Sequence, residues 1–557
     1  MDLTDKLKGK NLKILAAAVF LVLLLLQLAF LCYFGGHKEG FHEDEFYSYY
    51  STNKTAGLFV NDRQWVERNE FRNDFVVLKG EQFRYGIVKQ MQSWDVHPPL
   101  YYYILHTACS LFPGIFSKWL GIGVNLIAFV PCFFLLAYLA YSCAAEKEKE
   151  ESRKKAGFLA FATCLFWGFS AAVISGVMFI RMYQWLTLFV LLCACLHIRA
   201  VKKQNFGPSF LIPLAITVFL GFMTQYYYII FHFFLGAAFC FMLLREKRIK
   251  DLIGYAASCA IGLALAICYY PSSMSHIFRG YRGTEAVSEF SNAGNTIERL
   301  RFFGQLFDQY VVNGNLAGFL LIICLLWITV SYLEKRKGTA GRNLLDEERK
   351  KTRQAVGLLL FACGGYFFTI SKTALLLGET SNRYQLPVYG IILFLLLYFL
   401  VTPVEMLINR YGKEKRKTEK VKRAAALILS AVILMIDGTA LKNGRVFFLY
   451  EEEKTVMEYV KANEDAAVVV FYNEASPDNV WRLSDELMVF SEIYLACAGN
   501  MESIMDEKIT GSDKLLVYAA DHESREACLD LLLKSNENLS EYQMIAQKPI
   551  WTLYELH

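Results

Sequence analysis

The sequence is poor in charge. Only 20% of its 557 residues are charged, and the net charge is +5. So small a basic excess, gathered in short clusters, indicates membrane orientation rather than nucleic-acid binding. The sequence also lacks metal-type cysteine spacing, because its 14 cysteines include no CxxC pair and most lie in apolar runs. We expect these cysteines to be small buried apolar residues, with neither disulfides nor a bound metal.

Apolar residues are abundant, at 55% of the chain, and many uninterrupted runs reach the roughly 20 residues that a helical span requires. The first run, Leu15 to Phe34, follows a lysine-rich segment. Its apolar core is too long for a signal peptide, and no small-residue cleavage site follows it. We therefore predict a membrane anchor with a cytoplasmic N-terminus.

Five basic clusters orient the remaining runs. They lie at 147–155, 199–203, 245–250, 335–353 and 410–423. Because each lies in a short connection, the positive-inside rule places all five in the cytoplasm, and an even number of spans must separate neighbouring clusters. The segment 98–113 is then a membrane-surface or re-entrant segment. The predicted spans, eleven in all, are 15–34, 118–143, 157–178, 182–198, 207–224, 226–244, 252–270, 314–333, 355–372, 386–408 and 424–441.

Two large regions lie outside in this arrangement, the loop 35–97 and the tail 442–557. The tail has two β-rich apolar runs and two helical patterns, which predict a small extracytoplasmic α/β domain. The runs are Ala466 to Tyr472 and Lys514 to Ala519, and the helical patterns are Asp485 to Leu495 and Ser524 to Leu533. The predicted fold is an all-α polytopic membrane bundle over 1–441, followed by this domain.

The outer loop begins with three consecutive acidic residues, Glu43 to Glu45, flanked by aromatic residues. Carboxylates directly after a span are costly to hold near lipid. They form either a solvated helix cap or a functional group in which one carboxylate removes the proton of an acceptor hydroxyl.

The loop ends with Asp95-Val96-His97-Pro98-Pro99. The two prolines block helix formation and hold the chain extended. In an extended chain Asp95 and His97 point to the same side, where either can orient a substrate or contact a phosphate. The alternative is a proline-defined helix start beside an aromatic belt.

Two arginines, Arg181 and Arg383, lie at predicted outer ends of spans. An ionisable group at membrane depth is a functional candidate, and the planar guanidinium suits phosphate. The alternative is an interfacial arginine whose head group extends to water. Lys372 and the turn 225–228 lie on the same predicted surface and are weaker candidates.

These motifs together resemble the protein O-mannosyltransferase family and its bacterial relatives, which include the aminoarabinose transferases and other polyprenyl-phosphate-sugar glycosyltransferases. The resemblance rests on Asp44-Glu45 just after the first span and on the later stretch from Asp95 to Leu100, and it covers roughly 1–440. It implies the GT-C fold, a bundle of about a dozen membrane helices with its active site at the outer surface. Tyr101 and Tyr102 replace the family's glycine and lysine, which favours the bacterial branch over true protein mannosyltransferases.

The resemblance also implies roles for single residues. Asp44 is the expected base or acceptor-positioning residue, with Glu45 as its partner. Arg181 matches an arginine on the donor phosphate, and Arg383 lies in a stretch that resembles the family's Arg-Tyr-x-x-Pro. The full predicted donor and substrate site comprises Asp95, His97, Arg181, Tyr183, Arg383 and Tyr384.

The predicted function is inverting transfer of a single sugar from a polyprenyl-phosphate carrier to a hydroxyl acceptor, a lipid, glycan or protein, at the outer face of the cell membrane. The sequence has no DxD motif of the nucleotide-sugar type, which favours a lipid-linked donor that lies among the membrane lipids. We expect no metal or other cofactor. A polymer ligase or oligosaccharyltransferase of the same fold is an alternative, weakened because the loop 271–313 has no acidic metal cluster. A transporter or flippase is a further alternative. Such a protein would show charged residues in the middle of its spans, or broken helices at corresponding places in two halves of the chain.

Overall fold

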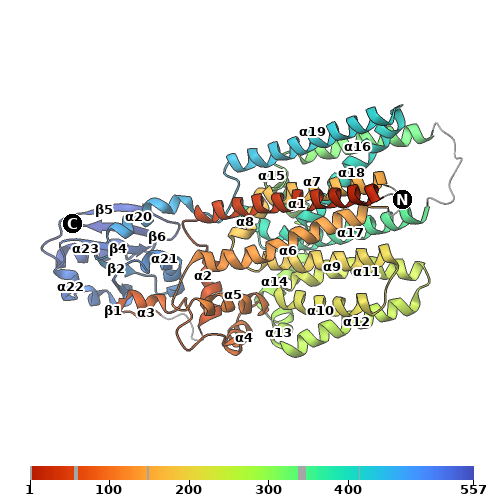
Figure 1. Cartoon of the computed structure of the whole chain (residues 1–557). Helices are drawn as coiled ribbons and strands as arrows, with labels where there is room; N and C mark the ends of the chain where they lie inside the picture. Colours follow the sequence, from red (N-terminus) through yellow and green to blue (C-terminus); the bar gives the residue numbers. More distant parts are fainter. Residues whose placement is uncertain (1–2, 55–59, 147–149, 336–345, 413) are drawn as a thin grey trace.

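The computed structural model describes residues 3–54, 60–146, 150–335, 346–412 and 414–557. Parts of three predicted basic clusters, 147–149, 336–345 and 413, lie outside these residues. A small sheet domain lies at one end of a long helical bundle, and the N-terminus lies at the opposite end (Figure 1). The predicted all-α bundle with a C-terminal α/β domain is confirmed.

Nine described helices are long and apolar enough to cross a membrane. They are α1 (Leu3–Gly36), α6 (Lys118–Ala144), α9 (Tyr183–Lys203), α11 (Tyr227–Arg245), α12 (Ile249–Tyr269), α16 (Leu316–Lys335), α17 (Asp346–Thr373), α18 (Leu386–Tyr411) and α19 (Lys415–Lys442). The chain is therefore a multi-pass membrane protein. The predicted number of eleven is not exact, because one further span is bent and another helix is shorter than a full span.

The bent span consists of α7 (Glu150–Phe169) and α8 (Ala171–Met178), which meet at an angle of 56°. Ser170 causes the restart, because its Oγ accepts a hydrogen bond from the Val173 main-chain N–H at 3.4 Å and so caps α8. The shorter helix is α10 (Pro208–Thr224), with 17 residues. The sequence predicted both segments as ordinary spans, because hydropathy registers apolar length and not a bend.

The outer loop and the segment 98–113 that follows it fold into four helices and one short strand. These are α2 (Glu43–Asn53), β1 (Trp65–Glu67), α3 (Arg68–Arg72), α4 (Tyr85–Trp94) and α5 (Leu100–Leu111). At 12 residues, α5 is too short to cross a bilayer, in agreement with the surface or re-entrant segment predicted there. The loop 271–313, called the second outer region below, carries α13 (Ser272–Phe278), α14 (Tyr281–Ser291) and α15 (Thr296–Tyr310), and the 3₁₀ helix η1 (Gly378–Tyr384) precedes α18.

The C-terminal domain contains a six-stranded sheet with the order β1-β3-β2-β4-β6-β5. Its strands are β2 (Ala467–Phe471), β3 (Glu492–Ala496), β4 (Leu515–Ala520), β5 (Tyr542–Gln547) and β6 (Trp551–Leu556), and its longer helices are α20 (Lys454–Ala462) and α23 (Arg525–Ser535). Short helical turns complete the domain at η2 (Glu451–Glu453), η3 (Pro477–Leu483), α21 (Ser484–Leu487), η4 (Ala498–Ile504) and α22 (Glu507–Thr510). The helix predicted at Asp485 to Leu495 is wrong beyond Leu487, because β3 pairs there on both of its edges and tertiary pairing overrides local periodicity.

The edge strand β1 comes from the outer loop, more than 400 residues before its partner β3. Trp65 is paired with Tyr494 in antiparallel register, and its indole Nε1 donates to Asp506 Oδ1 at 3.1 Å. Arg68 Nε donates to the carbonyl of Phe490 at 3.1 Å. These contacts fasten the outer loop to the C-terminal domain and thereby hold α2 beside it.

Candidate active site

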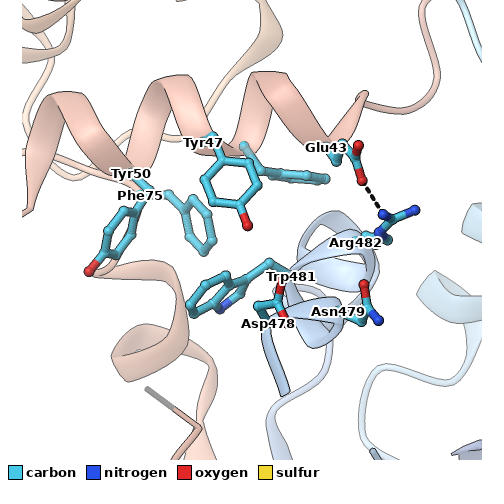
Figure 2. A pocket seen from close by; sticks show the side chains of 9 residues that line it. Glu43, Tyr47, Tyr50, Phe75, Asp478, Asn479, Trp481 and Arg482 are labelled. Atoms are coloured by element: carbon cyan, nitrogen blue, oxygen red, sulfur yellow. Dashed lines mark ion pairs between the residues drawn. The ribbon is translucent and has the colours of Figure 1, made fainter. Parts of the chain in front are cut away.

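The first turn of α2 carries three consecutive carboxylates, and each meets a cation from a different part of the chain. His42 caps this helix, because its Nδ1 accepts a hydrogen bond from the main-chain N–H of Asp44 at 3.0 Å. Negative charge is favoured at a helix N-terminus. The pairs are Glu43 with Arg482 (Figure 2), Asp44 with Arg383 (Oδ2 to Nη2, 3.3 Å) and Glu45 with Lys38 (Oε2 to Nζ, 2.9 Å).

Asp44 is the carboxylate that faces the two predicted arginines. Its side chain is 30% exposed, so one side stays open. Burial alone would raise the pKa of the Asp44 carboxyl, but the guanidinium groups of Arg181 and Arg383 outweigh burial and lower the pKa to about 2. Asp44 is therefore ionised at neutral pH.

Arg181 lies in the buried junction between α8 and α9 and ties three elements together. Its Nη1 donates to the main-chain carbonyl of Asp44 at 3.3 Å, to Ser48 Oγ at 3.2 Å and to Tyr102 Oη at 3.1 Å. Its Nη2 lies 3.2 Å from His97 Nε2. The junction, α2 and the start of α5 therefore share one guanidinium.

Asp95 and His97 form a chain of contacts that ends at Arg181. His97 Nδ1 lies 2.8 Å from Asp95 Oδ2. Because a guanidinium has only donors, His97 Nε2 accepts from Arg181, and the Nδ1–H of His97 then donates to Asp95. Burial raises the pKa of the Asp95 carboxyl, but His97 and Arg181 outweigh burial, so that the pKa lies below its ordinary value. The motif therefore orients Arg181.

Arg383 lies in η1 with 4% of its side chain exposed. Its guanidinium carbon lies 4.9 Å from the ring centroid of Phe179 and 5.1 Å from that of Tyr384, and its Nη2 donates to Tyr384 Oη at 3.3 Å. Nε and Nη1 are buried and have no hydrogen-bond partner among the described residues. Unpaired buried donors are unfavourable, so this edge of Arg383 suits an anionic oxygen.

The two predicted tyrosines belong to the same cluster. The ring of Tyr183 lies 5.8 Å from that of Tyr384, which also meets Tyr227 of the weaker candidate turn at 6.0 Å. Gln225 of that turn accepts the Tyr226 main-chain N–H at 2.7 Å and so serves the local backbone. The structure places Lys372 differently, because its ammonium donates to Asn292 and Asn295 of the second outer region.

Glu45 lies beside Asp44 in sequence but points away from the arginines into the protein. Besides Lys38 it accepts the main-chain N–H groups of His42 at 2.7 Å and Ile180 at 2.8 Å. Its side chain and that of Lys38 are fully buried. Because Ile180 precedes Arg181, this carboxylate holds Arg181 in place relative to α2. The arrangement favours a positioning role over direct contact with substrate.

We expect Glu45→Gln to lower stability by about 3 kcal/mol or more, because the buried Lys38 ammonium then loses its counter-charge. The measurement is the melting temperature of the purified protein in detergent. Glu150→Gln is the matched control, since it removes one partner of an exposed pair with Lys154 and should leave the melting temperature unchanged. The double variant Lys38→Met with Glu45→Gln should recover part of the loss. An unchanged melting temperature for Glu45→Gln would contradict the positioning role.

A large apolar hollow opens beside the cluster. It has a volume of about 1060 Å³ and is bounded by the C-terminal ends of α1 and α19, by η1 and by the segment 444–452. Phe448, which lines it, stacks on Phe179 with ring centroids 4.1 Å apart. Phe179 in turn contacts Arg383, so two stacked rings separate the hollow from the guanidinium.

Several residues of this site were not predicted from the sequence. Lys38, Ser48, Phe179 and Phe448 contribute contacts, and Tyr102 was noted only as a departure from the family pattern. A lone lysine just after the first span was the one available signal for Lys38. Nothing local in the sequence pairs Phe448 with Phe179. In the part of the chain that the structure describes, no three histidine, cysteine or acidic side chains are grouped to hold a metal.

The sequence matches no model of a known protein family and no curated protein. Among solved structures, the chain is similar to the crystal structure of ArnT from Cupriavidus metallidurans bound to undecaprenyl phosphate. The identity is 10%, each chain is covered to 98%, and the TM-score is 0.48. The apo crystal structure of the same protein has the same identity and coverage and a TM-score of 0.47.

Proposed function

We propose that this protein is an inverting glycosyltransferase of the GT-C type. It moves a single sugar from a polyprenyl-phosphate carrier to a hydroxyl acceptor at the outer face of the membrane. The N-terminus lies in the cytoplasm and the C-terminal domain outside. The observation that carries the proposal is the contact between Asp44 and Arg383 at 3.3 Å, beside an apolar hollow at the outer helix ends.

The donor phosphate binds between the two arginines. Arg383 offers two buried N–H groups that have no partner among the described residues, and Arg181 is held rigidly by its four contacts. Such preorganised donors stabilise the charge that develops on a leaving phosphate. The two guanidinium groups supply this stabilisation, and we propose that transfer requires no metal.

Asp44 acts as the base on the acceptor hydroxyl. With a pKa of about 2 it is ionised but only weakly basic while Arg383 is paired with it. The incoming phosphate binds the unpaired edge of Arg383 and offsets its positive charge, which raises the basicity of Asp44 when the donor is in place. The acceptor oxygen then attacks the anomeric carbon, Asp44 takes the proton, and the lipid phosphate leaves. A single displacement inverts the anomeric centre.

The hollow accommodates the carrier chain. It lies at the outer ends of α1 and α19, where an isoprenoid enters from the bilayer, and aromatic residues on its wall lead to Phe179 and Arg383. An apolar chain in the hollow and a phosphate at the arginines together match a polyprenyl phosphate.

The test is to incubate the purified protein with a panel of polyprenyl-phosphate sugars and an acceptor mixture, and to follow release of the free lipid phosphate. We expect release with at least one donor, an inverted anomeric product, and the same rate in the presence of a chelator. Transfer of whole oligosaccharides would indicate a ligase instead. No release with any donor, combined with movement of intact lipid between leaflets, would indicate a flippase.

Filling the hollow should weaken donor binding selectively. We expect Val446→Trp to raise KM for a long-chain donor about tenfold, while a donor with only two isoprene units is affected much less, because the bulky ring displaces the distal chain. Val421→Trp, an exposed position on α19 outside the hollow, is the matched control. Equal effects on both donor lengths would contradict this path for the carrier.

A further inference from the structure

A second, smaller pocket lies between α2 and the C-terminal domain. Its volume is about 220 Å³. Glu43 and Tyr47 reach it from α2, and Trp481 and Arg482 reach it from η3 (Figure 2). Neither the donor arginines nor the apolar hollow contributes to it.

The three carboxylates in the first turn of α2 point to three different sides of the helix. Glu43 and Tyr47 lie on one side of α2, whereas Asp44 lies about 100° further around the helix, as consecutive helical residues do. Glu45 lies a further step around, toward Lys38. The pocket and the carboxylate that we assign as the base therefore lie on adjacent faces of the same helical turn.

The pocket combines aromatic rings with hydrogen-bonding groups. Trp481 is 5% exposed and stacks on Tyr50 with ring centroids 5.8 Å apart, so its position is fixed. Tyr47 is 40% exposed, and its hydroxyl points across the pocket toward the η3 side (Figure 2). Asp478 and Asn479 add a carboxylate and an amide at the rim.

The charges exclude an anionic guest. Arg482 is already neutralised by Glu43, and Asp478 adds a negative charge at the rim. Tyr50 covers one face of Trp481, which leaves its other face for the guest. A neutral ring with apolar C–H faces and several hydroxyls matches both the rings and the polar rim. The volume is below the roughly 300 Å³ at which pockets for drug-sized ligands begin, so one ring fits.

We propose that this pocket binds one sugar ring of a saccharide acceptor and presents a hydroxyl of that acceptor to Asp44. This inference rests on the proposed function and gives its acceptor a chemical class. It also assigns a function to the C-terminal domain, since η3 forms one wall of the acceptor site. The strand β1 and the pair of Glu43 with Arg482 hold that wall against α2.

Binding of methyl α-mannopyranoside and methyl β-glucopyranoside to the full-length protein in detergent tests the proposal, with choline as a cationic probe. Saturation-transfer NMR reports each ligand. We expect at least one glycoside to bind the wild type, and Tyr47→Ala and Asp478→Asn to weaken that binding about tenfold. The matched controls are Tyr411→Ala on α18 and Asp513→Asn on the C-terminal domain, both exposed and outside the pocket. Trp481 is left unchanged because it is buried.

The proposal is overturned if no glycoside binds the wild type, or if glycoside binding is the same in Tyr47→Ala and Asp478→Asn as in the controls. Binding of choline alone also overturns it. Release of lipid phosphate from a polyprenyl-phosphate sugar is measured on the same preparations. If release occurs without glycoside binding, the acceptor inference fails and the glycosyltransferase remains. If glycosides bind but no donor is ever turned over, the proposed function fails instead.

Discussion

Replacing Asp44 with Asn is expected to reduce sugar transfer by about 10³-fold or more, while binding of the lipid donor changes little. Asparagine keeps the shape of the side chain but cannot take a proton from the acceptor hydroxyl. The loss of negative charge beside Arg383 leaves that guanidinium free for phosphate, so donor affinity should not fall. The effect therefore belongs to kcat.

Single-turnover release of lipid phosphate measures the transfer, and binding of a fluorescent polyprenyl phosphate measures donor affinity. Asp521→Asn, which neutralises an exposed carboxylate on the C-terminal domain, is the matched control and should retain the wild-type rate. If Asp44→Asn kept more than about a tenth of the rate, Asp44 would not be the general base.

Replacing Arg383 with Gln is expected to reduce kcat by about 10²- to 10³-fold and also to weaken donor binding, because one preorganised donor group to the phosphate is removed. Arg383→Lys should recover little of this loss. Lysine restores the charge, but it lacks the planar guanidinium. The guanidinium packs on Phe179 and Tyr384 and at the same time offers two N–H groups to one anion. The combined fall in kcat and donor affinity distinguishes this variant from Asp44→Asn.

The matched control for Arg383 is Arg279→Gln, at an exposed position just after α13 in the second outer region. Melting temperatures of all variants separate lost chemistry from lost folding, since Arg383 is buried. A variant with Gln at 383 that folded normally and bound the donor as tightly as the wild type would remove Arg383 from the phosphate site.

The sequence determined much of this protein without help from tertiary structure. Apolar run length and basic clusters act locally along the chain, so they predicted the helical bundle. Local strand and helix patterns predicted the small α/β domain at its end. The same reasoning selected Arg181 and Arg383, because ionisable groups at membrane depth are rare, and the family resemblance singled out Asp44 among the three carboxylates. The structure brings these three residues, with His97, into one cluster.

The tertiary structure decided what each polar residue faces. Three adjacent carboxylates look alike in sequence, yet helical geometry sends Glu43 to the C-terminal domain, Asp44 to the arginines and Glu45 to a buried lysine. Their cationic partners lie 7, 339 and 439 positions away in the sequence, and no local pattern shows which cation each carboxylate meets. Hydropathy also could not show the bend at Ser170, the strand that the outer loop adds to the sheet, or the aromatic pocket between two regions. The added strand and the pocket arise only when distant segments pack, because packing, not local periodicity, fixes which surfaces meet.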